Sequence, residues 1–441
     1  MLRSLTLRTF VFNSNIVLLG LGASILLSRW LGPEGRGEVA AAMLWPTLLV
    51  YFSSIGLISS TLYFAALPDA KTEKVFANAM LIAGLQSLIV LLLGYIALPR
   101  LLSSQTAVVV NLSRLYLLVI PLSLATQYGL SILQGRMHIS SFNRLRAVIP
   151  LGYLLGLLAF KAAGVLSLKA IILLHLVFNA VGLMLTFFTL LRMKIRLSLR
   201  PDIDLARQMI RYGLKVYLGD VSQGMNLRLD QMMMAAWLPP VQLGLYVVAV
   251  SSASLPQQIL SGAVRTVISP AITQNRSDEK RAVMLQELFR KYLLASFLIT
   301  IVSGACLPLL IPLVYGRDFI GATWPAEVLV GGALLIGAKE VLSAGAQAFG
   351  NPWLSSRAEI LSSAVTVLLL LVLLPRWGIF GAAVASLLAY GAQLVVVVYG
   401  LRHSHAISPI KLFRVKSKDV DSLLSTVWLG GANLAEALKL R

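Results

Sequence analysis

Long apolar runs separated by short polar connections make up most of this chain of 441 residues. A helix needs about 20 apolar residues to cross the hydrocarbon core of a bilayer, and most of these runs approach that length. Barrel strands would alternate apolar and polar residues, whereas these runs are continuous, so the pattern predicts membrane-spanning helices. We expect about twelve spans, near residues 9–28, 39–66, 77–98, 110–134, 145–162, 168–191, 208–236, 242–269, 292–315, 324–348, 358–375 and 378–401.

Composition supports the same class. Only 13% of the residues are charged, against about 25% in soluble domains, and the mean hydropathy is +0.82. The predicted fold class is therefore all-α, a polytopic membrane protein. The single cysteine, Cys306, excludes an internal disulfide framework and a cysteine metal site.

Basic residues gather in alternate connections between the predicted spans. If the N-terminus is cytoplasmic, most lysines and arginines lie on the cytoplasmic side, as the positive-inside rule requires, and both termini are then cytoplasmic. This distribution accounts for the net charge of +20, so nucleic-acid binding is not needed to explain it.

The chain divides at its longest polar connection, residues 192–208. The segment "RWLGPEGRGEVAAA" after the first span is similar to "AWLPPVQLGLYVVA" after the seventh. The matched pairs are Trp30 and Trp237, Leu31 and Leu238, Pro33 and Pro240, Gly37 and Gly244, and Ala42 and Ala249. Six spans intervene, so we predict a parallel repeat of two six-helix lobes around a central cavity. The expected lobes are 1–200 and 201–401, followed by a cytoplasmic tail, 402–441, expected to form a surface helix.

A small set of ionisable side chains lies inside the predicted spans. A charge at the centre of a bilayer costs about 2.5–3.5 kcal/mol on insertion scales, so such residues are functional candidates. They are Arg114, Lys215, Asp220, Arg228, Asp230, Arg265, Lys339 and Glu340, and His175 is expected to be a hydrogen-bonded packing residue.

The seventh span holds the most informative pair, Arg228 and Asp230. Two residues on a helix are about 200° apart, so the two charges are not expected to neutralise each other directly. Asp220, Gly224 and Arg228 would share one stripe of the helix. These charges either fix helix packing or line a polar cavity in which basic groups hold an anionic headgroup. Lys339 can pair with Glu340 or with Arg228, or it can serve only to hold helices together, and Arg265 can be a cavity residue or extend to the interface.

The absence of known catalytic and nucleotide-binding motifs restricts the possible functions of the chain. The chain has no G-x-x-x-x-G-K-[ST] motif for an ATP-driven motor. The sequence "PDID" at 201–204 resembles a D-x-D metal site, but its position before a helix favours an N-cap. Short outer connections leave no room for a catalytic domain, so no enzyme, cofactor or metal site is expected.

Several segments resemble a known family. "LSRWLGPEGRGEVAAAMLWPTLLVYFSSIGLISSTLYFAA", "NLRLDQMMMAAWLPPVQLGLYVVAVSSASLPQQI", "VISPAI", "PLVYGRDFIGATWP" and "LPRWGIFGAAVASLLAYGAQLVVVVYG" are similar to the bacterial polysaccharide-biosynthesis flippases for O-antigen and exopolysaccharide. These belong to the multidrug/oligosaccharidyl-lipid/polysaccharide exporter superfamily. The resemblance covers most of the chain.

The resemblance implies alternating access in the bacterial inner membrane. Its substrate would be an undecaprenyl-diphosphate-linked oligosaccharide repeat unit, moved from the cytoplasmic to the periplasmic leaflet, with other polysaccharide-assembly proteins as partners. Arg228 and Asp230 match a basic/acidic pair of the family's seventh helix, and Gly32, Pro33 and Gly37 match its turn motif.

In this interpretation Arg228 engages the diphosphate first, with Asp220, Arg265 and Lys339 as further cavity residues. Asp230 or Asp220 would carry a coupling H+ or Na+. The alternatives are a cation-coupled drug exporter of the same superfamily, a polymerase or ligase of lipid-linked sugars, and a membrane scaffold.

Overall fold

The computed structural model of the chain contains two compact units. The backbone is described for residues 2–193, 195, 200–226, 228–273, 277–351, 353–405, 407–414 and 416–419. Within these ranges, side chains are not described for residues 2–11, 218–226, 258, 259, 261–273 and 405. Unit 1 comprises residues 1–248 and 314–319, and unit 2 comprises residues 249–313 and 320–441.

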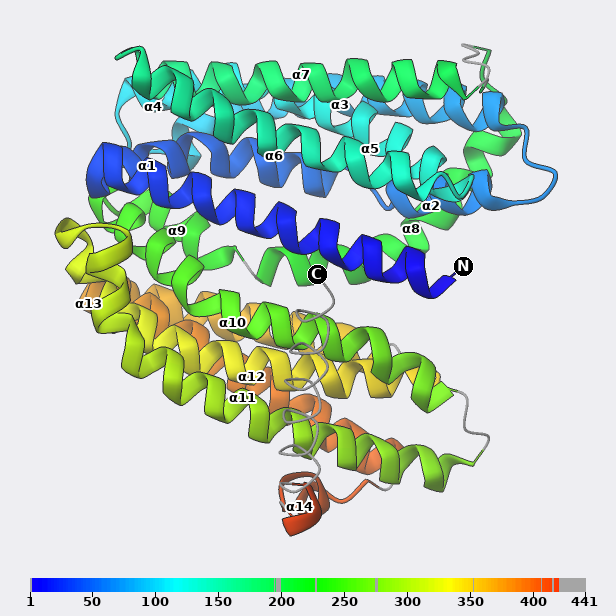
Figure 1. Ribbon diagram of the computed structural model, residues 1–441, viewed down its shortest axis with the longest axis vertical. Helices are drawn as coiled ribbons and strands as arrows, with labels where there is room; N and C mark the ends of the chain where they lie inside the picture. The colour runs from blue at the N-terminus through cyan, green and yellow to red at the C-terminus, as the bar shows by residue number, and fades with distance from the viewer. Residues whose placement is uncertain are drawn as a thin grey trace, which may run out of the picture. The chain divides into compact units, whose positions relative to one another are not determined.

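Unit 1 is a bundle of packed helices (Figure 1). Its helices are α1 (Leu2–Ser53), α2 (Leu57–Ala66), α3 (Thr72–Leu101), α4 (Ala107–Tyr116), α5 (Val119–Gly135), α6 (Ile139–Ala162), α7 (Leu168–Arg192), α8 (Ile203–Asn226), α9 (Leu229–Trp237) and the start of α10 (Pro240–Thr273). Within it α6 packs against α1 and α7, and α5 packs against α2, α3 and α7.

Unit 2 is also helical. It contains the rest of α10, α11 (Asp278–Val314) as far as Leu313, the second half of the 3-10 helix η1 (Arg317–Ala322), α12 (Thr323–Ala348), α13 (Trp353–His405) and the short α14 (Pro409–Phe413). Its apolar core joins α11, α12 and α13 and includes Phe289, Leu342, Val397 and Leu412. The predicted surface helix of the tail is described only as far as α14 and residue 419.

The all-helical membrane fold is confirmed. The described residues contain no strand, and eight helices among them are long and apolar enough to cross a membrane. The expected count of twelve is not confirmed. Two of the eight are long helices, α1 and α13, which break at Gly32 and Gly378. Helix α13 covers the last two predicted spans, whereas α1 covers the first and part of the second, 39–66, whose remainder is in α2. The expected lobes, 1–200 and 201–401, stay a prediction.

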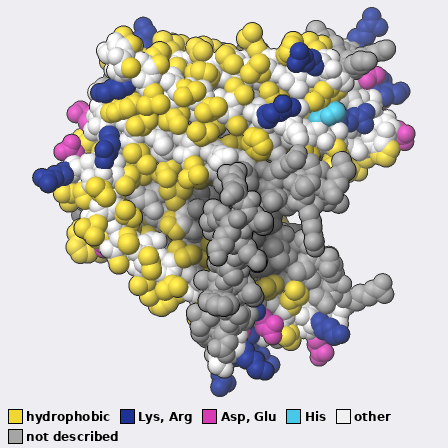
Figure 2. Space-filling view, in the orientation of Figure 1, with side chains coloured by type: hydrophobic (Ala, Val, Ile, Leu, Met, Phe, Trp, Pro, Cys, Tyr) yellow, Lys and Arg dark blue, Asp and Glu magenta, His cyan; other side chains and the backbone are white. Residues whose placement is uncertain are grey.

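The outer surface of the bundle is apolar. On α3, Leu85, Leu88, Leu92 and Ile96 are exposed, with exposed fractions of 54–71%, along one face of the helix. Figure 2 shows apolar side chains spread over much of the visible face of the described chain. In water such a surface would drive aggregation, whereas lipid tails solvate it without cost.

Candidate functional site

The seventh predicted span is interrupted at its charged segment. Helix α8 ends at Asn226 and α9 begins at Leu229, with Arg228 as its N-cap in a non-helical conformation (φ −133°, ψ −3°). The single continuous helix expected over 208–236 is therefore wrong. The predicted stripe of Asp220, Gly224 and Arg228 does not exist as one helical face, because the helix does not continue through Arg228.

At this break Arg228 and Asp230 form hydrogen bonds with different groups. The Asp230 carboxylate is 5% exposed in the first turn of α9 and accepts a hydrogen bond of 2.5 Å from the Tyr246 hydroxyl of α10. It also accepts one of 2.7 Å from the backbone N–H of Gln231. The start of a helix favours a negative charge, so this location stabilises the carboxylate.

Arg228 is exposed and bonds to a different group. Its Nη1 donates to the Oε1 of Gln231 at 2.9 Å. The expectation that Arg228 and Asp230 do not simply neutralise each other holds, but the cause is the helix break and not an angular separation on one helix. Because Gln231 bonds to both residues, it couples the position of the basic group to that of the acid.

Arg36 is a site residue that the sequence reasoning missed. The predicted span boundaries put it in an outer connection, but α1 resumes after Gly32 and carries Arg36 inside a candidate span, Phe12–Ser53. Its Nη2 donates to the Ser24 Oγ at 3.4 Å, while its buried Nε has no hydrogen-bond partner in the described chain. Proline at position 33 was the available signal, because Pro commonly begins a helix and so places Arg36 one turn inside it.

The positive charge of Arg228 acts on that of Arg36, although no direct contact joins the two side chains in the described part of the chain. The groups that act on the charge of Arg36 are Tyr153, Tyr315 and Arg228, all in unit 1. Two cations whose charges act on each other, one with an unbonded N–H, form an arrangement that an anion would stabilise.

The predicted turn residues bring the two repeat segments into backbone contact. Gly32 has φ +67°, which favours glycine, and Pro33 follows it where the helix resumes. A Cβ on Gly37 would overlap the carbonyl oxygen of Pro240, and one on Gly244 would overlap that of Pro33. These four residues form two of the matched pairs of the sequence repeat, Pro33 with Pro240 and Gly37 with Gly244, and each glycine contacts the proline of the other segment, so the repeat corresponds to a reciprocal contact.

Lys339 lies in unit 2 and has a partner that the sequence reasoning overlooked. Its ammonium forms an ion pair of 2.5 Å with the Oε1 of Glu359, and the two side chains are 3% and 8% exposed. This pair joins α12 to α13. The expected pairing with Glu340 or Arg228 is therefore wrong. A lysine inside one span, with an acid at the start of the next, was the signal that could have identified Glu359.

The side chains of the two remaining candidates, Asp220 and Arg265, lie outside the described residues, so their predicted roles stay predictions.

Two other interpretations are confirmed. His175 packs in unit 1, where its Nδ1 lies 2.8 Å from the Tyr116 hydroxyl and 3.0 Å from the Nδ2 of Asn179. Asp202 caps α8, since its Oδ1 accepts from the backbone N–H of Leu205 at 3.1 Å. In the described chain, no group of histidines, cysteines and acids could hold a metal ion.

Comparison with solved structures shows the fold of the chain. The lipid II flippase MurJ in an inward closed conformation superposes with a TM-score of 0.77 at 15% identity, covering 90% of this chain and 87% of that one. A multidrug resistance MATE family transporter of the MOP superfamily, in an inward-facing conformation, gives a TM-score of 0.73 at 15% identity, with 89% and 95% covered.

Sequence comparison adds a relative and a family. A probable low-salt glycan biosynthesis flippase of Haloferax volcanii is 24% identical over 299 residues, which cover 66% of this chain and 60% of that protein. These three relatives are named as flippases and transporters, not as enzymes. Residues 26–323 match the family described as polysaccharide biosynthesis protein, and this match extends over more than half of the sequence. The chain belongs to the polysaccharide biosynthesis protein family.

Proposed function

We propose that this protein is a flippase for a lipid-linked oligosaccharide. The substrate is an undecaprenyl-diphosphate-linked repeat unit, moved from the cytoplasmic to the periplasmic leaflet of the bacterial inner membrane by alternating access. Family membership, the name of the glycan flippase relative and the likeness to the MurJ fold support the proposal. Both termini are cytoplasmic in this scheme, as the distribution of basic residues indicates.

The observation that carries the proposal is the buried Nε of Arg36, which has no hydrogen-bond partner in the described chain, together with the positive charge of Arg228, whose field reaches Arg36. A diphosphate presents several anionic oxygens, and each guanidinium can bind two of them in a fork-like geometry. Bound diphosphate would also relieve the repulsion between the two arginines. A drug exporter for cationic compounds would instead require an acidic surface at this position.

Asp230 is the candidate for coupling to an ion gradient. Its buried carboxylate accepts from Tyr246 and from a backbone N–H. Binding H+ or Na+ there would change the charge beside Arg228 through the shared contact with Gln231. Neutralising the Asp230 carboxylate would leave the positive charge of Arg228 less compensated. This would alter the affinity for the diphosphate in one of the two access states.

The test is a deletion strain whose lipid extracts are analysed for polyprenyl-diphosphate oligosaccharides by leaflet, together with its surface glycan. Repeat units trapped in the cytoplasmic leaflet, with surface glycan lost, would support the flippase. Plasmid-borne wild-type protein should restore export, and Arg228→Gln should not, at equal membrane abundance. Units that reach the outer leaflet but remain unpolymerised would point to a polymerase or ligase.

The second candidate is a cation-coupled drug exporter, which the fold likeness to the MATE transporter favours. It predicts normal surface glycan in the deletion strain and lower tolerance to cationic drugs. The same strain therefore separates the two candidates, because each predicts a phenotype that the other excludes.

A further inference from the structure

Unit 1 contains a polar cavity whose lining includes neither Arg36 nor Arg228. The cavity has a volume of about 530 Å³ and is lined by Ala70, Thr72, Glu73, Arg136, His138, Met193 and Ile195. Cavities of about 300–1,000 Å³ are the usual size for small-ligand sites. Three separate chain segments contribute to it: the start of α3, the turn between α5 and α6, and the connection that follows α7.

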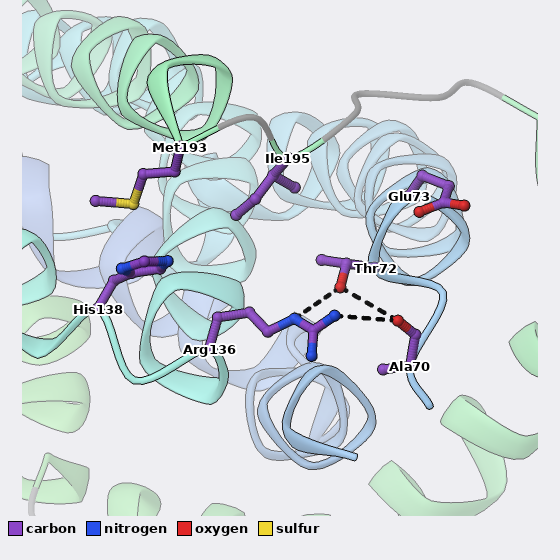
Figure 3. A pocket seen from close by; sticks show the side chains of 7 residues that line it. All are labelled: Ala70, Thr72, Glu73, Arg136, His138, Met193 and Ile195. Atoms are coloured by element: carbon purple, nitrogen blue, oxygen red, sulfur yellow. Dashed lines mark hydrogen bonds between the residues drawn. The ribbon is translucent and has the colours of Figure 1, made fainter. Parts of the chain in front are cut away.

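Arg136 lines this cavity and is held in place by neutral oxygens. Its Nε donates to the Thr72 hydroxyl at 2.9 Å and its Nη2 donates to the carbonyl oxygen of Ala70 at 3.1 Å (Figure 3). These bonds orient the guanidinium without neutralising its charge. They also use only two of its five N–H groups, so donors for a ligand remain.

The turn that carries Arg136 is strained. Met137 has φ +60°, which is unfavourable for a residue with a side chain, and the Met137 side chain is 64% exposed. This conformation directs the residues on either side of it, Arg136 and His138, to the lining of one cavity. Such strain persists where the surrounding structure enforces it, often at ligand-binding positions.

The cavity lies at the level where membrane spans end. Candidate spans begin at Thr72 and Ile139 and end at Gly135 and Arg192, next to the lining residues. The ends of membrane-spanning helices generally lie near the boundary between hydrocarbon and headgroups, where lipid phosphates are found. The apolar side chains of Met193 and Ile195 line the same cavity, so it offers both a cationic surface and an apolar one.

We propose that this cavity is a binding site for a phosphate group, with Arg136 and His138 as the donors. The phosphate is that of an anionic lipid headgroup at the membrane surface or a free phosphate from the adjoining solution, and the experiment separates these sources. The proposal does not depend on flippase activity, since it concerns binding to the purified protein. Glu73 lines the same cavity, and its negative charge opposes an anion there.

The purified full-length protein would be titrated in detergent with three probes, with binding followed by native mass spectrometry. The probes are dioctanoyl-phosphatidylglycerol, dioctanoylglycerol (which lacks the phosphate) and inorganic phosphate. Binding of the phosphatidylglycerol but not of dioctanoylglycerol would support the lipid source. Arg136-dependent binding of inorganic phosphate, with no preference for the lipid, would support the free source.

Variants test whether the cavity is responsible. Arg136→Gln should weaken binding by about tenfold or more, as expected for loss of a charge-assisted bond. Glu73→Gln should strengthen binding, a direction that simple damage to the fold would not produce. Arg144→Gln is the matched control, because Arg144 is exposed on α6 and donates its Nε to the carbonyl of Ser140 in its own helix; it should leave affinity unchanged.

Ile195→Glu covers the case in which Arg136→Gln fails to fold. It places a carboxylate in the cavity while leaving both bonds of Arg136 intact, and it should abolish binding of the phosphate probes. Equal affinity for all variants and the wild type, or equal binding of dioctanoylglycerol, would overturn the proposal.

Discussion

Gly37 and Pro240 are in backbone contact, and Gly244 and Pro33 make the equivalent contact in reverse. A methyl group at either glycine would overlap a carbonyl oxygen of the opposite segment, so the helices would have to separate. We expect Gly37→Ala and Gly244→Ala each to lower the free energy of unfolding by about 1–3 kcal/mol, as for other overpacked contacts.

Thermal unfolding of the purified protein would measure this effect. Gly84→Ala is the control, since no atom lies within 4 Å of the position that its Cβ would occupy. Equal melting temperatures for Gly84→Ala and Gly37→Ala would contradict the close contact.

The arginine pair gives a prediction about transport. If the proposed function holds, Arg36→Gln and Arg228→Gln should each reduce export of the lipid-linked unit by about 10–100-fold, because each would remove a proposed charge-assisted bond to phosphate. Surface glycan and leaflet-resolved lipid would be measured at matched protein abundance. Arg114→Gln is the control: Arg114 is a span arginine whose guanidinium lies 4.3 Å from the ring centre of Tyr95. If Arg36→Gln exported normally, the arginine pair would not be the headgroup site.

The ion pair in unit 2 separates packing from substrate binding. Lys339→Met should destabilise the protein by about 3–5 kcal/mol, because it leaves the Glu359 carboxylate buried without its cation. The double variant Lys339→Met/Glu359→Met should recover most of that stability. Export by the refolded double variant then decides the role of Lys339: retained export means packing, and lost export in a stable protein means substrate contact.

The tail residue Asp419 gives a prediction about pH. A hydrogen bond from Arg290, of 2.6 Å, is the main cause that lowers the pKa of Asp419 below its ordinary value of 3.8. Since the folded pKa is depressed, this contact stabilises the docked tail above pH 3.8 and is lost as the pH falls through the lowered value.

Hydrogen exchange of residues 407–419 would follow the docking of the tail. The wild-type segment should stay protected at neutral pH and lose protection only in strong acid. Arg290→Gln should lose it already at neutral pH, because Arg290 also donates to the carbonyl oxygen of Lys411 at 3.0 Å. Protection that is unchanged by Arg290→Gln would show that the apolar contacts of Leu412 and Phe413 suffice.

The sequence alone determined the membrane class, the helical fold and the turn at Gly32 and Pro33. Apolar runs report directly on lipid exposure, since every helix that crosses a bilayer must carry one. The matched residues Pro33 and Pro240, with Gly37 and Gly244, were visible because close backbone contact restricts the residue type. Arg228 and Asp230 stood out for a similar reason, as charges in a span carry an energetic cost.

Only the tertiary structure decided which groups meet. The helix break at Arg228 separates this residue from the predicted stripe that begins at Asp220. The sequence pattern around Arg228 did not predict that break. Glu359 pairs with Lys339, and the charge of Arg228 acts on Arg36, between chain positions that helical periodicity cannot connect. Such pairings depend on how helices cross and where they bend, and these are set by the packing of many side chains together.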